Sequence, residues 1–173
     1  MTAQRTPRKT EKSATRETVR DLDRVDCKLL RILQRDGRTS ISQLAREVHL
    51  SVTPTLERVR KLEANGYIQG FFARLNARRL GLSLLAYVEV QLDRTTRDAF
   101  ERFKSAMLSY EEVLDCHMVA GGFDYLLKVR VRDMENYRSF LGDRIASLPG
   151  VQQTHTYFVM EEVKSTHAIA VPG

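Results

Sequence analysis

The sequence has little of what secreted, disulfide-linked or membrane-spanning proteins need. Its 173 residues include only two cysteines, Cys27 and Cys116, and these lack C-x-x-C spacing. Buried reduced thiols are therefore expected rather than a disulfide framework. The longest uncharged apolar run, Leu80–Val88, has nine residues, whereas a membrane-spanning helix needs about 20. The first residues are basic and contain no continuous apolar stretch, unlike a secretory signal peptide. We expect a cytoplasmic protein with no membrane partner.

Signatures of catalysis and of metal binding are also missing from the sequence. Cys116 and His117 are neighbours, so in a strand they would point to opposite faces and could not act as nucleophile and base. The candidates for a metal site show none of the spacings typical of zinc ligands; they are Asp115, His117, Asp124 and His155. We expect no enzyme activity, no metal and no cofactor.

The charge that is present is unevenly distributed. The chain has 28 Lys and Arg against 22 Asp and Glu, a formal net charge of +6. Residues 1–20 hold six basic and two acidic side chains, residues 21–80 hold 12 and 7, and residues 81–173 hold 10 and 13. A basic front half joined to an acidic rear half suggests that a polyanion binds at one end. Residues 1–20 have almost nothing to bury, so we expect a basic disordered tail there.

Residues 21–67 show the spacing and turn signals of three helices. The first follows Asp21 or Asp23 as N-cap and ends before Asp36. Ser40 and Gln43 form a capping box at the start of a short second helix. The third helix starts near Ser51 or Thr53, with Pro54 in its first turn, and stops at Asn65-Gly66. Its predicted buried stripe consists of Val52, Leu56, Val59 and Leu62.

Two short helices with a tight turn, the second exposing hydroxyls and cations, are typical of a helix-turn-helix DNA-binding domain. A three-helix domain with a solvated face is the alternative. Within the DNA hypothesis, Ser51 and Thr53 would contact phosphate or a base edge, and Arg58 would reach guanine or phosphate. The full set of expected DNA-binding residues is Ser42, Ser51, Thr53, Pro54, Arg58, Arg60 and Lys61.

After residue 67 the pattern changes to alternation. Residues 68–80 are predicted to form a linking strand, Ile68–Leu75, and a hinge. Residues 81–164 then show strand, helix, strand, strand, helix, strand, which is the ferredoxin-like βαββαβ plan, followed by a C-terminal tail at 165–173. The fold class is therefore α+β. The predicted strands are Leu84–Leu92, Val113–Ala120, Tyr125–Val131 and Val151–Val163, and the helices are capped by Thr95 or Thr96 and by Asp133.

Both helices would pack on one face of this sheet, so the other face would have to be buried against something else. The second face is too apolar for water, which predicts that two sheets associate; its residues include Leu85, Tyr87, His117 and Tyr157. The Gly121-Gly122 turn leaves backbone groups approachable, and Asp124 could pair with the ammonium group of an amino acid. The residues alone favour the alternative, in which Asp124 caps the turn through its own backbone.

Four segments resemble the Lrp/AsnC family of bacterial transcription regulators: LDRVDCKLLRILQRDGR, TPTLERVRKLEANGYIQGF, CHMVAGGFDYLLKVRVRDMENYR and LPGVQQTHTYFVMEEVK. The resemblance covers about residues 21–164. It implies a winged-helix-like head, a linking strand and a RAM-type effector domain that dimerises through its sheets and forms rings of dimers, with an octamer expected. It also implies an effector site between dimers, formed by Gly121, Gly122, Asp124, Tyr125, Met134, Tyr157 and Val159. His49 stands where the family often has glycine.

Together these features predict a sequence-specific regulator that binds double-stranded DNA and responds to leucine or a related amino acid through its oligomeric state. The expected location is the cytoplasm, in association with the nucleoid. Two alternatives remain open. One is an amino-acid-binding regulatory subunit of an enzyme, and the other is a nucleoid-organising DNA-binding protein without an effector.

Overall fold

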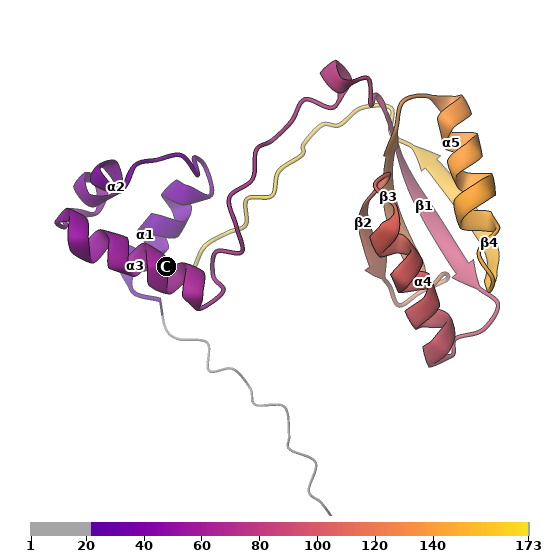
Figure 1. Ribbon diagram of the computed structural model, residues 1–173, viewed down its shortest axis with the longest axis horizontal. Helices are drawn as coiled ribbons and strands as arrows, with labels where there is room; N and C mark the ends of the chain where they lie inside the picture. The colour runs from indigo at the N-terminus through magenta and orange to yellow at the C-terminus, as the bar shows by residue number, and fades with distance from the viewer. Residues whose placement is uncertain (1–21, 173) are drawn as a thin grey trace, which may run out of the picture. The chain divides into compact units, whose positions relative to one another are not determined.

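The computed structural model describes residues 22–172, so the basic tail expected at residues 1–20 lies outside the described part. The chain divides into two compact units (Figure 1). The first contains the described residues up to Phe72 and the C-terminal residues from His167 on, and the second spans Ala73–Thr166. No helix within residues 22–172 is both long enough and apolar enough to cross a membrane.

The first unit contains the three expected helices, α1 (Arg24–Leu33), α2 (Ile41–Val48) and α3 (Val52–Ala64). Their starts follow the predicted caps, since the Asp23 carboxylate accepts a hydrogen bond from the Asp26 N–H at 2.8 Å and the Ser40 hydroxyl accepts one from Gln43 at 3.2 Å. Their inner faces share one core, made of Leu29, Leu33, Leu44, Val48, Val59 and Leu62. The predicted three-helix head is confirmed.

The tight turn between α2 and α3 depends on an unusual backbone conformation at His49. Its φ of 56° and ψ of 42° are left-handed, and among the described residues no other non-glycine has a positive φ. This conformation lets the Leu50 N–H donate to the Ala45 carbonyl at 3.0 Å and closes α2. α3 can then begin only three residues after His49.

The buried stripe of α3 differs from the prediction at its first turn. Val52 is 49% exposed, whereas Thr55 is fully buried. Thr55, Val59 and Leu62 have the i, i+4, i+7 spacing of one helix face. The Thr55 hydroxyl donates to the Ser51 carbonyl at 2.9 Å, so its burial leaves no unsatisfied polar group. The prediction was wrong here because it considered apolar residues only.

The linking strand expected at Ile68–Leu75 is not formed. Residues 68–76 have no regular structure and lead to a 3₁₀ turn, η1 (Arg78–Leu80). A strand needs a neighbour for its backbone groups, and no described strand of this chain pairs with the segment. Phe72 and Leu75 remain 88% and 70% exposed.

The second unit has the predicted βαββαβ order. It consists of β1 (Leu84–Leu92), α4 (Arg97–Ser109), β2 (Val113–Met118), β3 (Tyr125–Val131), α5 (Met134–Phe140), a π-helical turn η2 (Leu141–Ala146) and β4 (Val151–Phe158). The sheet order is β2-β3-β1-β4 with every neighbouring pair antiparallel. Both helices cover the same face of the sheet (Figure 1).

The core of this unit lies between the sheet and α4, α5 and η2. Tyr137, Phe140 and Ile145 are the buried residues of the last helical segment. Phe140 and Ile145 are five residues apart, a spacing that would place them on different faces of an α-helix. The π-helical turn has more residues per turn, so Ile145 also faces the core. The ferredoxin-like architecture is confirmed.

The C-terminal part of the chain corrects one strand boundary. β4 ends at Phe158, not Val163, and the Val159 N–H donates to the Leu85 carbonyl, close to the first residue of β1. β1 offers no partner beyond that point. Within the first unit, the Gln34 side-chain amide exchanges two hydrogen bonds of 3.1 Å with the backbone of Ile169, and Arg31 donates to the carbonyls of Val171 and Pro172.

Candidate functional site

The first turn of α3 presents polar groups away from the core. Ser51 has the extended backbone of an N-cap, but its hydroxyl makes no capping hydrogen bond. Thr53 and Pro54 follow in the first turn, and all three residues are exposed. The N–H groups of a first helical turn have no partner within the helix and carry partial positive charge, so they attract anions such as phosphate.

Two further candidates extend this surface along α3. Arg60 and Lys61 are exposed, and within the described part of the chain neither has an ion-pair partner. Ser42 is exposed in the first turn of α2. The outer side of α3 thus carries Thr53, Pro54, Arg60 and Lys61, next to Ser51 at its N-cap, together with the exposed carboxylates of Glu57 and Glu63. Arg60 and Lys61 form no ion pair with these carboxylates within residues 22–172.

Arg58 behaves differently from the other candidates. Its guanidinium contacts Asp23 at 2.6 Å and Asp26 at 2.8 Å, and its side chain is 33% exposed. These hydrogen bonds to Asp26 and Asp23 raise the pKa of the Arg58 guanidinium above its ordinary value. The pKa of Asp23 is lowered, chiefly by the Asp26 backbone N–H it accepts and also by Arg58. Arg58 therefore joins α3 to the start of α1.

The sequence predicted a DNA contact for Arg58 but not its ion pairs with Asp23 and Asp26. The signal was available in the two acidic residues three positions apart, Asp23 and Asp26, at the start of α1. Both lie on the helix terminus that attracts carboxylates. An arginine placed opposite two such carboxylates is a favourable charge-assisted pairing.

The expected effector turn connects β2 to β3. It covers residues 119–124, so it is longer than the two-residue hairpin that Gly121-Gly122 suggested. Both glycines are exposed, and a Cβ added to either would meet no atom within 4 Å. Neither glycine has a positive φ. The turn therefore offers open space around its backbone.

Asp124 anchors this turn to the sheet. Its carboxylate accepts a hydrogen bond of 2.7 Å from the Leu92 N–H at the end of β1. Its own N–H donates to the Val90 carbonyl at 3.0 Å, and its carbonyl accepts from Val119 at 2.9 Å. The carboxylate thus holds the neighbouring strand rather than capping its own turn, which corrects the simpler interpretation. One carboxylate oxygen has no hydrogen bond within residues 22–172.

Tyr125 does not face the turn's open side. It is 1% exposed and points toward the helices, where its ring packs 4.4 Å from Phe103 and 6.1 Å from Phe100, measured between centroids. Burial raises the pKa of its phenol, with smaller contributions from nearby acidic groups. Its hydroxyl has no hydrogen-bond partner in the described structure.

Two of the remaining effector candidates, Met134 and Val159, lie at the other end of the sheet, and Tyr157 lies between the two ends. Met134 follows the far end of β3 and is 47% exposed. Tyr157, 55% exposed, pairs with Tyr87 on the face without helices, and Val159 lies just beyond β4. The six steps from Tyr125 to Val131 span about 20 Å, so one copy does not bring Met134 or Val159 to the Gly121–Asp124 turn. Tyr157 is opposite Tyr87, three steps or about 10 Å along β1 from Val90, and lies on the far side of β1 from the turn.

Comparisons with known proteins agree with this architecture. Residues 22–69 match the model for winged helix-turn-helix DNA-binding domains, and residues 85–169 match the model for the Lrp/AsnC ligand binding domain. The chain is 52% identical over 152 residues to the leucine-responsive regulatory protein of Klebsiella pneumoniae and 51% identical over 152 residues to that of Escherichia coli K12. Each match covers 88% of this chain and 93% of the relative.

Two solved structures of transcriptional regulators have a similar fold. A transcriptional regulator from Neisseria meningitidis, determined as a complex with L-methionine, superposes with a TM-score of 0.83 at 35% identity, over 87% of this chain and 97% of that one. An AsnC family transcriptional regulator from Agrobacterium tumefaciens gives 0.82 at 31% identity, over 86% and 97%.

A DNA-binding helix-turn-helix unit joined to a ligand-binding βαββαβ unit defines a transcription regulator, and its relatives are regulators rather than enzymes. This chain belongs to the Lrp/AsnC family.

Proposed function

We propose that this regulator binds specific promoter DNA through the start of α3 and that leucine or a related amino acid changes this binding by changing how copies of the chain assemble. The exposed first turn of α3, which has no acidic residue, with the cations Arg60 and Lys61, unpaired within the described residues, further along the helix, is the observation that supports DNA binding most strongly. The names of the relatives and the L-methionine complex of a similar structure support an amino-acid effector. The proposed location is the nucleoid in the cytoplasm.

The proposed DNA contacts divide into two kinds. Ser51, Thr53 and the backbone N–H groups of the first turn would meet a phosphate or a base edge, with Pro54 packed beside them. Arg60, Lys61 and Ser42 would contact phosphates, which gives affinity and register but no sequence information. Arg58 would act through α1 by fixing the angle of α3, because it would otherwise have to leave two carboxylates.

The proposed effector site needs more than one copy of the chain. Gly121, Gly122 and Asp124 would come from one copy, with the free oxygen of Asp124 available to an ammonium group. Met134, Tyr157 and Val159 would come from another, since Met134 and Val159 lie at the opposite end of the sheet from the turn and Tyr157 lies on the far side of β1 from it. A ligand that binds between copies favours one assembly only through its differential affinity for the assemblies.

A binding assay on promoter fragments tests the DNA part of the proposal. Full-length protein would be titrated onto fluorescent fragments in the presence of competitor DNA at several salt concentrations. We expect Lys61→Ala to weaken binding to all sequences similarly. It should also make the salt dependence shallower, reducing the magnitude of the negative slope of log affinity against log salt by about one. Thr53→Ala should reduce the preference for the promoter if Thr53 meets a base edge.

Arg102→Ala on α4 is the matched control, because Arg102 is also an exposed helical cation but lies in the other unit. It should bind DNA as the unchanged protein does. An equal loss in Arg102→Ala and Lys61→Ala, or no preference for any promoter fragment, would contradict the proposal.

A further inference from the structure

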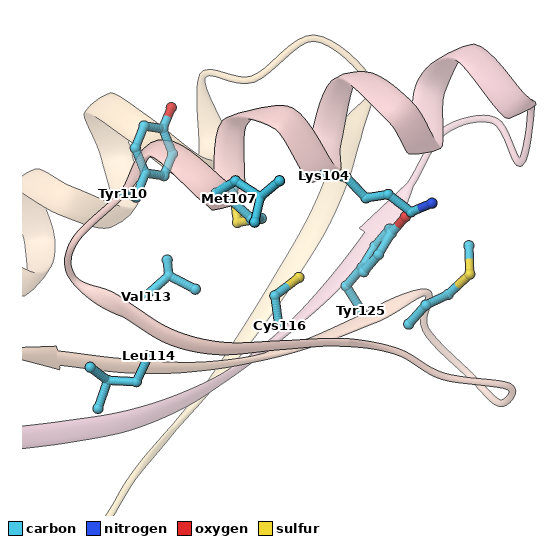
Figure 2. A pocket seen from close by; sticks show the side chains of 9 residues that line it. Lys104, Met107, Tyr110, Val113, Leu114, Cys116 and Tyr125 are labelled. Carbon is cyan, nitrogen blue, oxygen red and sulfur yellow. The ribbon is translucent and has the colours of Figure 1, made fainter. Parts of the chain in front are cut away.

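A pocket of about 450 Å³ opens between α4 and the edge strand β2 (Figure 2). Its walls are mostly apolar and come from α4, β2 and the segment between them, with Met107, Leu108, Val113, Leu114 and Met118 as the aliphatic residues. Leu108 is 89% exposed and therefore lies at the mouth. The volume falls in the range of small-molecule sites, about 300–1,000 Å³.

The polar groups of this pocket include an ammonium and a buried hydroxyl that can donate hydrogen bonds, and they include no carboxylate. Tyr125 reaches into the pocket from β3, and Figure 2 shows its ring directed toward α4, where Lys104 lies. The Tyr125 hydroxyl is buried and unpartnered within the described residues. Burial also raises the pKa of Cys116, so its thiol stays neutral. No Asp or Glu is among the lining residues.

The Lys104 ammonium is available despite one existing contact. It lies 3.0 Å from Glu101 one turn earlier on α4, with side-chain exposures of 49% and 61%. Exposed pairs of this kind contribute little free energy. A carboxylate at the pocket mouth could therefore displace Glu101 from Lys104.

We propose that this pocket binds a small aliphatic monocarboxylate, with its chain among Met107, Leu108 and Val113 and its carboxylate accepting hydrogen bonds from Lys104 and Tyr125. A carboxylate only accepts hydrogen bonds, which matches two donors. An ammonium group would find no acidic partner in the lining, and a purely apolar occupant would leave the Tyr125 hydroxyl unsatisfied. This site lies under α4 and adjoins the effector turn through Met118 and Tyr125, but it includes none of the turn's residues 119–124 and does not depend on the proposed function.

Octanoate is a suitable probe, with octanamide and octylammonium as matched compounds of equal chain length. Calorimetry on the full-length protein should show octanoate binding at least about tenfold more tightly than the other two, since only a charged acceptor gains the stronger bonds. Methyl-labelled methionine NMR should place the shifts at Met107 and Met118. Shifts at other methionines, or equal affinity for the three compounds, would overturn the proposal.

Single substitutions distinguish hydrogen bonding by Lys104 and Tyr125 from hydrophobic binding of the octanoate chain alone. Lys104→Met and Tyr125→Phe should each weaken octanoate binding several-fold, and Tyr125→Phe should not lower the melting temperature because it removes a hydroxyl without a partner. Glu101→Gln should strengthen binding by freeing Lys104. Arg102→Met, one residue along from Glu101, is the control and should bind as the unchanged protein does.

Unchanged affinity in both Lys104→Met and Tyr125→Phe would overturn the site. Shifts at Met107 and Met118 that follow protein concentration instead of octanoate would also overturn it, because a second copy would then be the occupant. DNA binding measured without octanoate reports on the proposed function independently.

Discussion

Within residues 22–172, His49 is the one non-glycine residue with a left-handed backbone conformation. A residue with a Cβ in left-handed geometry is disfavoured by roughly 1–2 kcal/mol, and this turn fixes the spacing between α2 and α3. The resemblance to the family already drew attention to a missing glycine here, and the φ of 56° confirms that the position needs left-handed geometry.

We expect His49→Gly to raise the free energy of unfolding by up to about 1 kcal/mol, because glycine adopts this conformation without a steric penalty, while the greater freedom of glycine in the unfolded chain offsets part of that gain. Urea denaturation of the full-length protein measures the change. Gly66→Ala is the opposite control, since Gly66 has a φ of +75° after α3 and should become less stable. A less stable His49→Gly protein would show that the His49 side chain contributes contacts that outweigh the backbone strain.

At the scale of elements, the contact of Arg58 with Asp23 and Asp26 joins α3 to the start of α1. We expect Arg58→Ala to lower the free energy of unfolding by about 1 kcal/mol, a modest value because the partners are partly exposed. Asp23 has a lowered pKa in the folded state. Its stabilisation is therefore present above its unfolded pKa of about 3.9 and is lost as the pH falls through the folded pKa.

The difference in stability between Arg58→Ala and the unchanged protein should accordingly be largest near neutral pH and shrink at acidic pH. Denaturation curves from neutral pH down to pH values near the pKa of Asp23 measure it. Asp26→Asn combined with Arg58→Ala should cost less than the sum of the two single changes, because the residues interact directly. Additive costs would mean that the ion pair contributes nothing to stability.

The elements also show what the sequence could predict. Helix starts were readable because caps such as Ser40 and Asp133 are local, and Asp133 does accept the Asn136 N–H at 2.8 Å. The buried face of a helix could not be predicted where a polar residue belongs to that face, as the buried Thr55 shows. The prediction of a linking strand was wrong for a different reason. Alternating apolar residues indicate a strand, but they do not show whether a neighbouring strand is present to pair with it.

The candidate sites divide in the same way. Exposure of Thr53 and Lys61 follows from helical spacing alone. The pairing of Arg58 with α1 and the burial of Tyr125 depend on tertiary packing, which a local pattern does not contain. The distance between Asp124 and Tyr157 depends on strand register, so only the structure shows that one copy leaves them apart.

At the scale of the whole molecule, the sheet face without helices is the surface that the predicted pairing of two sheets would bury. Tyr87 and Tyr157 are cross-strand neighbours there, and Tyr157 is 55% exposed. We expect Tyr87→Asp to shift the protein toward monomers, because burying an added carboxylate between two sheets is unfavourable.

Sedimentation equilibrium at micromolar concentration measures this shift. Arg138→Asp, on the exposed side of α5, introduces the same side chain on the helical layer and should leave the oligomeric state unchanged. If the unchanged protein is already monomeric at this concentration, the proposal of paired sheets is wrong.

The most direct test of the account is the coupling between amino acid and DNA. Leucine would be titrated into the protein with and without a bound promoter fragment, and DNA affinity would be measured with and without saturating leucine. Since linkage is reciprocal, the account predicts that each ligand changes the affinity for the other by the same factor, on the order of 5- to 150-fold, and that Asp124→Ala abolishes this coupling while DNA is still bound. Promoter affinity that stays the same across leucine and the other common amino acids would contradict it.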